Sequence, residues 1–467
     1  MAWKDVPLSA KLLTNVQEAA LRRASAAIEN AYVNEQGGFT RFPGLTDFVT
    51  LTGDAPTYLD RWRGDLVAVS NSRVWRIQPD GTAEDVTGAP VRGDGRVSFA
   101  RADNELAMAA GGEIIRFAGV ETELLSPDAP LASAVAYIDT YLLAAEAGSG
   151  RFYNSDAAEG TRSWNPVDVF AADGTPDNIT SMIVTPYREL IVAGPESTEQ
   201  YERLPSGTVP FFRRWSVGEG NTVPGSLIFA DNAVWMVNSN REFVRASGQT
   251  SQSRGDAVGV TLEDIDDWRG AWAAAVNVQG QKFIVLQAPY ATNTYDTAGV
   301  TLVHDFRQGH WFSLYGWDDR GFPARWPGWS YQFLWDRHFV GGNGRVYELD
   351  HRAFDNAGAV QRVLGRTAHF DDWGESRVDN VRLRFKRGTV SPNAEREPRI
   401  GLRVRRDNRD WTRWVYKSMG RTGAGEMVLE FGAFGCAHTW QFEWSTTAAV
   451  ELEVVRMQAD VTRIGTG

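Results

Sequence analysis

The sequence predicts an all-β protein: a β-propeller of six or seven blades with a C-terminal β-sandwich and a short N-terminal helical arm. Three observations carry this prediction. A two-strand pattern recurs seven times between residues 65 and 349, apolar and polar residues alternate along the segments after residue 361, and an alanine-rich stretch precedes residue 35. We therefore expect three parts: a helix or arm at 1–35, the propeller at 36–361 and the sandwich at 362–467.

The N-terminal arm is predicted from the stretch KLLTNVQEAALRRASAAIENAY at 11–32. This stretch is rich in alanine, contains neither glycine nor proline, and spaces Leu12, Val16 and Ala20 in helical steps. Alanine has the highest helix propensity, and apolar residues at such intervals lie on one face of a helix. We interpret the stretch as a helix or an ordered arm.

The propeller is predicted from the repeated pattern, an apolar strand followed by a short turn of small polar residues and a second strand. The copies are DLVAVSNSRVWRI (65–77), ELAMAAGGEIIRF (105–117), YLLAAEAGSGRFYN (141–154), ELIVAGPESTEQY (189–201), AVWMVNSNREFVRA (233–246), KFIVLQAPY with TLVHDF (282–306) and RHFVGGNGRVYEL (337–349). Their leading apolar residues, spaced 40, 36, 48, 44, 49 and 56 residues apart, are Leu66, Leu106, Leu142, Leu190, Val234, Phe283 and Phe339. A period of roughly 40–50 residues is typical of propeller blades. We expect each leading residue to lie on the innermost strand of a blade, buried between neighbouring blades.

The C-terminal sandwich is predicted from six segments in which apolar and polar residues alternate. They are NVRLRF (380–385), RIGLRVRR (399–406), TRWVYKSM (412–419), EMVLEF (426–431), TWQFEW (439–444) and VELEVVRMQA (450–459). A period of two is typical of strands that are wet on one face, and short polar turns between such strands favour a sandwich. We expect the part from about residue 377 onward to be a separate unit, so that its deletion leaves the propeller folded.

Composition and charge narrow the function. With 467 residues, 43% of them hydrophobic, and 18 tryptophans, the chain is expected to form a soluble globular protein of two or three domains. Its single cysteine, Cys436, excludes a disulfide framework within the chain and a cysteine-based zinc site. Neither a secretory signal pattern in the first ten residues nor a run of 18 apolar residues is recognisable.

Charge is unevenly distributed along the chain. Residues 362–467 carry 18 Lys and Arg against 14 Asp and Glu, a net charge of +4, whereas the other residues carry 30 against 45, a net charge of −15. Tight binding to DNA regardless of sequence requires neutralisation of phosphates, which an acidic body does not supply. The basic C-terminal part is expected to contact another subunit or another protein of opposite charge.

No catalytic, cofactor-binding or metal-binding residues are predicted. The chain contains no Gly-Lys dipeptide, and therefore no P-loop, and no GxSxG motif. The closest histidines, His304 and His310, do not have the spacing of a helical zinc site. The acidic stretch at Asp264, Asp266 and Asp267 lacks the later oxygen ligands of an EF-hand, so a solvated turn is the better interpretation.

A weak match to the Asp-box turns of sialidase propellers lies at 154–164. Asp156, Gly160, Ser163 and Trp164 provide the residue types of the box. Gaps of four residues separate Asp156 from Gly160 and Gly160 from Trp164, whereas the box requires gaps of two and three. An ordinary turn is therefore favoured.

Several blocks, in order, resemble one family, the packaged-DNA stabilisation proteins of short-tailed bacteriophages, which are also called tail hub or nozzle proteins. The blocks are GGFTRFPGLTDF (37–48), GRVSFARADNELAMAAGGEIIRF (95–117), RFYNSDAAEGTRSWNPVDVFAADGTPDNITSMIVTPYRELIVAGPESTEQYE (151–202), VPFFRRWSVGEGNTVPGSLIFADNAVWMV (209–237), TLVHDFRQGHWF (301–312) and the closing VELEVVRMQADV (450–461). Together they extend over most of the chain.

This resemblance implies a structural virion protein and no enzyme. The family suggests a homo-oligomeric ring of six subunits in the virion tail, assembled in the host cytoplasm below the portal and adaptor proteins. Double-stranded DNA passes through such a ring without sequence-specific binding, and tail fibres or tailspikes, with a needle or plug protein, bind to it. An acidic wall suits a conduit because it repels phosphates. The long connections at 288–300 and 316–336 are candidates for loops that narrow the lumen.

A second function remains open at this stage. Propellers often bind ligands at the centre of the ring, so a carbohydrate-binding or glycosidase-type propeller is the alternative. Glycoside hydrolysis requires two carboxylates at a common centre, and the sequence cannot test whether any two converge.

Overall fold

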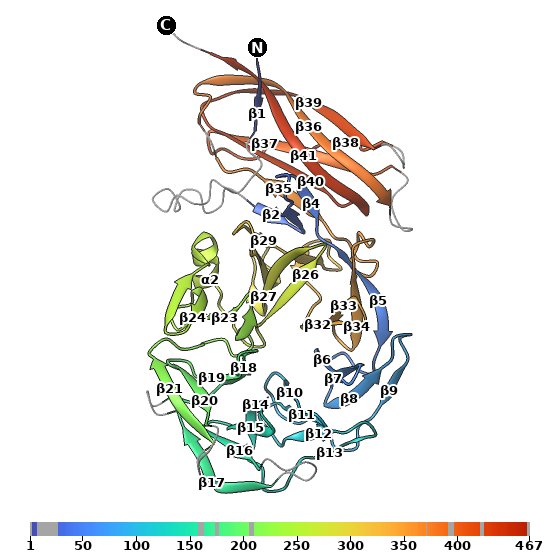
Figure 1. Ribbon diagram of the computed structural model, residues 1–467. Coiled ribbons are helices and arrows are strands. Elements are labelled where there is room, and N and C mark those ends of the chain that lie inside the picture. The colour runs from blue at the N-terminus through green and yellow to red at the C-terminus, as the bar shows by residue number, and fades with distance from the viewer. Residues whose placement is uncertain are drawn as a thin grey trace.

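The computed structural model describes residues 2–6, 27–156, 163–172, 177–204, 210–369, 371–390, 397–420 and 425–464. The described chain is almost entirely β, as predicted. Its helical elements are the single turn η3 (Asp256–Val258) and the short helix α2 (Gly259–Glu263). A ring of small sheets forms one part of the molecule, and a two-layer β-structure that carries both chain termini lies beside it (Figure 1).

Seven four-stranded units form the ring, each an antiparallel meander from the axis outward. Blades one to four are β6 (Thr57–Trp62), β7 (Asp65–Ser70), β8 (Arg73–Ile77), β9 (Ala83–Asp85); β10 (Ser98–Arg101), β11 (Leu106–Ala109), β12 (Ile115–Phe117), β13 (Thr122–Leu124); β14 (Ala132–Ile138), β15 (Tyr141–Glu146), β16 (Arg151–Ser155), β17 (Trp164–Ala171); and β18 (Ser181–Val184), β19 (Glu189–Ala193), β20 (Thr198–Arg203), β21 (Phe211–Val217). Blades five to seven are β22 (Ile228–Ala230), β23 (Ala233–Val237), β24 (Phe243–Ser247), β25 (Thr250–Ser253); β26 (Trp272–Val278), β27 (Gln281–Thr292), β28 (Ala298–Asp305), β29 (Trp311–Ser313); and β32 (Ser330–Leu334), β33 (Arg337–Gly341), β34 (Arg345–Asp350), β5 (Gly44–Thr50).

The ring is closed by a strand from the beginning of the described propeller. β5 pairs with β34 and so becomes the outermost strand of blade seven, although about 300 residues separate the two in sequence. An apolar cluster lies between each pair of neighbouring blades, including the pair formed by blades seven and one. Because a single blade cannot bury both faces, this stacking supplies the core of the propeller.

Each repeated hairpin belongs to one blade, as the spacing predicts, and forms the two middle strands of that blade. Six of the leading apolar residues are fully buried and Val234 is half-buried. The prediction that they lie on innermost strands is wrong, because each lies on the second strand. First strands of neighbouring blades, such as β10 with β14 and β14 with β18, contact one another around the axis. Second strands are covered on both faces by adjacent blades, so several of them read as apolar runs, such as LVAV in β7 and LIVA in β19.

The C-terminal part consists of two facing sheets. Its strands are β35 (Val363–Arg366), β36 (Ser376–Val390), β37 (Arg399–Arg406), β38 (Val415–Ser418), β39 (Glu426–Ala437), β40 (Trp440–Thr446) and β41 (Val450–Arg463). One sheet contains β41, β36 and β39, and the other contains β35, β40, β37 and β38. All six segments with alternating residues form strands here. β35 was not predicted.

The N-terminal segment belongs to these sheets. β1 (Ala2–Asp5) and β4 (Phe39–Arg41) pair with β41, β3 (Ala31–Val33) pairs with β4, and β2 (Ala27–Glu29) pairs with β35. The predicted helix at 11–32 falls mainly outside the described residues, and its described end is strand instead of helix. Pairing with β35 and β4 overrides the local helix propensity there. The domain limits at residues 35 and 361 stay a prediction.

Candidate functional site

One continuous sheet joins the propeller to the sandwich. β29, the outermost strand of blade six, pairs in parallel with β2, which in turn pairs with β35 of the sandwich. In Figure 1 these strands lie between the ring and the upper β-structure. Backbone hydrogen bonds therefore cross the joint, so the two parts are expected to move as one body.

A buried cluster of charged and polar groups locks this joint. The carboxylate of Glu29, on β2, is 4% exposed and accepts hydrogen bonds from the Arg362 guanidinium and the Tyr295 hydroxyl. Arg362 also donates to the Tyr295 hydroxyl oxygen at 2.6 Å. Burial and the nearby Glu29 charge raise the pKa of Tyr295, which therefore stays protonated as a donor. Glu29 thus links the hairpin of blade six to the linker that enters the sandwich.

Arg41 forms a second tie at the joint. Its guanidinium donates to the carbonyl oxygens of Phe354 at 2.6 Å and Ala448 at 2.7 Å, and so connects the end of the propeller to the sandwich. Burial lowers the pKa of Arg41 to about 9. The side chain of Asn30 binds backbone groups of two further segments at the joint. It donates a hydrogen bond to the Arg362 carbonyl oxygen and accepts one from the Tyr315 N–H.

The propeller axis is crossed by a side chain. Arg96 precedes the innermost strand of blade two and donates to the Trp329 carbonyl oxygen at 2.7 Å, at the start of blade seven. Its guanidinium stacks on the rings of Tyr58 in blade one and Trp272 in blade six, at 5.0 and 5.6 Å. Gly225, ahead of blade five, approaches Arg96 so closely that an added Cβ would lie 3.1 Å from its Cδ.

Arg96 therefore contacts residues at the starts of four other blades, which is possible only if it lies across the axis on that face. Burial lowers the pKa of Arg96 to about 10. Within the described part of the chain no carboxylate forms an ion pair with it. On that face the Arg96 side chain blocks the axis to a DNA duplex and occupies the position at which many propellers bind a ligand.

The sandwich exposes a group of cations at the edge strand β38. Arg409, Arg413 and Lys417 are exposed, and no carboxylate of the described residues pairs with them. Val415 and Tyr416 on the same strand are 40% and 55% exposed. We call these five residues the basic edge. Some other sandwich cations are neutralised, because Arg366 and Arg403 both pair with Glu443.

The family model described as "Bacteriophage P22 Gp10, beta-propeller", of the phage stabilisation proteins, matches residues 21–353. The chain belongs to this phage stabilisation family. It is accordingly a virion-associated structural protein with a propeller fold, as the sequence blocks indicate. No curated protein matches the chain.

Solved structures that resemble this phage stabilisation protein are distant. The computationally designed Ika8 protein is 14% identical, with a TM-score of 0.37 over 65% of this chain and 98% of its own. A streptogramin B lyase is 11% identical, with a TM-score of 0.44 over 66% and 97%. The extracellular domain of the one-component system BT4673 from B. thetaiotaomicron is 10% identical, with a TM-score of 0.42 over 90% and 62%.

The acidic residues singled out in the sequence serve turns. Asp266 accepts hydrogen bonds from the backbone N–H and hydroxyl of Thr292, which lower its pKa, and Asp267 pairs with Arg269. Among the described residues no group of three or more His, Cys, Asp or Glu could hold a metal ion. Likewise, no helix in the described ranges is both long and apolar enough to span a membrane.

The other singled-out segments are also structural. In the Asp-box-like turn of this phage stabilisation protein, Asp156 accepts from the Ser163 hydroxyl at 2.8 Å, while residues 157–162 lie outside the described ranges. The connection at 288–300 is mainly an extension of β27 and β28. The connection at 316–336 contains β31 (Pro323–Arg325), which pairs with β30 (Tyr315–Trp317), and the innermost strand of blade seven. Neither connection is the long free loop that the sequence suggests.

His304 is buried among aromatic rings and not in a metal site. It is 4% exposed between blades five and six, and its ring centroid lies 4.8 Å from that of Trp311 and 5.7 Å from that of Trp235. Burial lowers the pKa of His304 to about 4, from an ordinary value of 6.5. His310 lies beyond the turn after β28 and adds a smaller repulsive contribution.

Acidification is therefore expected to destabilise the protein through His304. The folded-state pKa lies below the unfolded one, so the unfolded chain binds more protons between about pH 6.5 and 4 and stability falls across this window. Between pH 7 and pH 5 the free energy of unfolding should fall by about 2 kcal/mol from this group. Urea unfolding of the wild type and of His304→Phe at both pH values checks this. An equal pH-dependent loss in both proteins would contradict it.

Proposed function

We propose that this protein is a tail nozzle: a homo-oligomeric ring of six copies that retains packaged DNA and conducts it during ejection. The observation that carries the proposal is membership of the phage stabilisation family across residues 21–353. The proposed neighbours are the portal or adaptor protein, tail fibres or tailspikes, and a needle or plug protein. The protein would assemble in the host cytoplasm and remain in the virion tail.

Arg96 restricts where DNA can pass. Because its side chain crosses the propeller axis, the conduit in this proposal is the space enclosed by neighbouring copies. The body outside residues 362–467 has a net charge of −15 and offers no net attraction for phosphates. Retention of DNA would then be mechanical, through narrowing of the enclosed space or through a plug.

The joint and the basic edge support assembly. A sheet that is continuous through β29, β2 and β35 makes each copy one rigid building block, which suits a wall under load. The basic edge of one copy has the charge that complements the acidic propeller of a neighbour or an adjacent tail protein. Complementary charge raises the association rate and fixes the register of the contact.

The alternative is a carbohydrate-binding or glycosidase-type propeller with its site at the centre of the ring. The position of Arg96 argues against it. Arg96, Tyr58 and Trp272 occupy the axis where such a ligand would bind. No pair of carboxylates converges there among the described contacts. A central catalytic site is therefore not favoured.

Ring assembly should depend on the basic edge. The double variant Arg413→Glu, Lys417→Glu is expected to weaken self-association at least about tenfold, because two attractive charges become repulsive. Native mass spectrometry and light scattering would measure the ring. The control Arg92→Glu, Lys282→Glu makes the same charge change on exposed propeller cations and should leave the ring intact. A wild type that stays monomeric at every concentration, or equal weakening in both variants, would reject this contact.

Particles assembled without the protein test the function itself. They are expected to release DNA after packaging, with empty heads in electron micrographs and a loss of infectivity that the wild-type protein restores. Particles that keep their DNA and infect as well as wild type would overturn the proposal.

A further inference from the structure

An open wedge separates the outer parts of blades four and five. Near the axis these blades meet in a small apolar cluster of Ala193, Leu227, Met236 and Val244. Farther out, a cavity of about 210 Å³ lies between β19, β20 and β21 of blade four and the strands of blade five. Aromatic rings fill the corresponding region between blades three and four, namely Phe152, Phe170, Tyr201 and Phe211.

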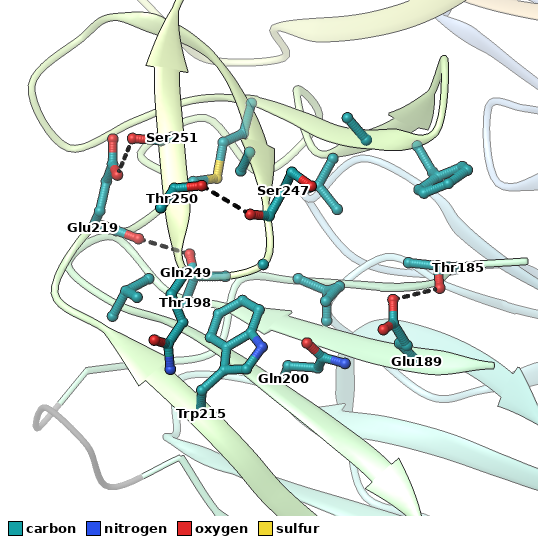
Figure 2. Close-up of a pocket in the computed structure, with 18 of the residues that line it drawn as sticks. Thr185, Glu189, Thr198, Gln200, Trp215, Glu219, Ser247, Gln249, Thr250 and Ser251 are labelled. Atoms are coloured by element: carbon teal, nitrogen blue, oxygen red, sulfur yellow. Dashed lines mark hydrogen bonds between the residues drawn. The ribbon is translucent and has the colours of Figure 1, made fainter. Parts of the chain in front are cut away.

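Two facing rows of side chains explain why the cavity is open. On blade four, strand pairing places Gln200 beside Trp215. On blade five, the facing row is Val234, Ala246 and Ser251. Ala246 and Ser251 are small and leave room in the cavity, whose lining also includes the Trp215 ring (Figure 2). No local sequence pattern reveals this site, because its lining comes from seven separate strands and the turns between them.

Hydrogen-bond acceptors line the wedge and are held in place by neutral donors. The Glu219 carboxylate accepts from the Ser251 hydroxyl at 2.6 Å, and the Glu189 carboxylate accepts from the Thr185 hydroxyl at 3.1 Å (Figure 2). Each carboxylate oxygen can accept more than one hydrogen bond, so both groups retain capacity for a ligand. The lining contains no Lys, Arg or His.

Donors line the same space. Gln200 is 4% exposed, and among the described residues its side-chain amide makes one long hydrogen bond, of 3.4 Å, to Glu202. Trp215 is half-buried, and no described residue accepts a hydrogen bond from its indole N–H. Aromatic surface completes the wedge, because Tyr187 and Phe229 also line it and pack edge to face at 6.0 Å.

This set of groups selects one ligand chemistry. Two carboxylates without a cation disfavour phosphate and other anions, whereas a cationic ligand would leave the donors without partners. A hydroxyl group both donates and accepts, so several hydroxyls satisfy the mixed set. The apolar face of a pyranose ring can cover Trp215. We propose that the wedge between blades four and five binds a neutral hexose residue of a glycan.

The size of the wedge sets the expected affinity. Drug-sized ligands occupy roughly 300–1,000 Å³, so a cavity of about 210 Å³ holds a single ring. A ligand with so few atoms binds with a Kd of about 1 mM. The site is complete within one copy and does not depend on the proposed ring. If the ring forms, its repeated wedges would strengthen binding to a polymeric glycan.

Saturation-transfer NMR with the methyl glycosides of glucose, galactose and mannose, and with N-acetylglucosamine, tests the proposal on the full chain. At least one sugar should bind with a Kd of about 1 mM. Trp215→Ala and Ala246→Phe should each weaken binding at least about tenfold, the first by removing the platform and the second by filling the space. Trp414→Ala, which removes a half-buried tryptophan of the sandwich, should leave binding unchanged.

Two outcomes would overturn the proposal. In the first, none of the sugars binds to the wild type, whose fold is verified by its cooperative unfolding. In the second, binding persists equally in both wedge variants, which would place the sugar elsewhere. N-acetylarginine amide serves as a competitor: if it binds at the wedge and the sugars do not, the site receives a cationic side chain of a protein partner and the glycan assignment is wrong.

Discussion

Replacing Glu29 with alanine is expected to lower the free energy of unfolding by about 3–5 kcal/mol, the usual cost of removing one partner from a buried ion pair. Arg362 would lose its counter-ion, and Tyr295 would lose the acceptor of its hydroxyl, both in a largely buried site. Because Glu29 lies on β2, the loss of stability is expected to affect the strand that joins blade six to the sandwich. Chemical denaturation measures the loss, and hydrogen exchange of β2 and β35 should quicken.

Two matched variants separate charge from packing at this joint. Glu29→Gln keeps the shape and one acceptor, so an intermediate loss is expected. Tyr295→Phe removes one hydrogen bond and should cost about 1 kcal/mol. If Glu29→Ala destabilised the protein no more than Tyr295→Phe, the cluster would not be what holds the joint.

The features that could be predicted from the sequence are those formed by residues close together along the chain. Each repeated hairpin, such as 65–77, combines a turn with two strands that are neighbours in sequence, so the local pattern contains the whole motif. The alternation in 399–406 or 450–459 similarly reveals strands that are covered on one face. The repeated hairpins and six of the sandwich strands follow from such signals, whereas the number of blades stayed at six or seven until the structure placed one hairpin in each of seven blades.

Long-range pairings could not be predicted in this way. β5 joins a strand about 300 residues away, and Glu29 meets Arg362 across 333 residues. IENAY at 28–32 reads as helix because its strand character comes from β35 and β4, which no local window contains. Arg96 and Trp215 are ordinary residues in sequence. Only the convergence of blades places the first on the axis and the second in the lining of the wedge.

Deleting residues 377–467 is expected to leave little soluble protein, contrary to what the sequence alone suggests. The main apolar cluster is shared by the propeller, the N-terminal strands and the sandwich, and 21 of its 42 described residues lie beyond 377. Removal of β41 also takes the partner strand of β4, and removal of Trp444 uncovers Phe39, whose ring lies 6.0 Å from it. Exposed apolar surface of this kind leads to aggregation.

A short truncation at the N-terminal end serves as the control for the deletion of 377–467. Deleting residues 1–5 removes only β1, which pairs with β41 and carries the exposed Asp5–Arg456 ion pair, so soluble yield and the unfolding midpoint should change little. The deletion of 377–467 should lower soluble yield about tenfold or more, because β4 loses its partner strand β41 and the main apolar cluster is uncovered. Soluble yield, thermal unfolding and limited proteolysis compare the two. A soluble, cooperatively unfolding 1–376 fragment would mean that the blades alone bury enough apolar surface to fold. The shared cluster would then serve to attach the sandwich to the propeller more than to fold the propeller.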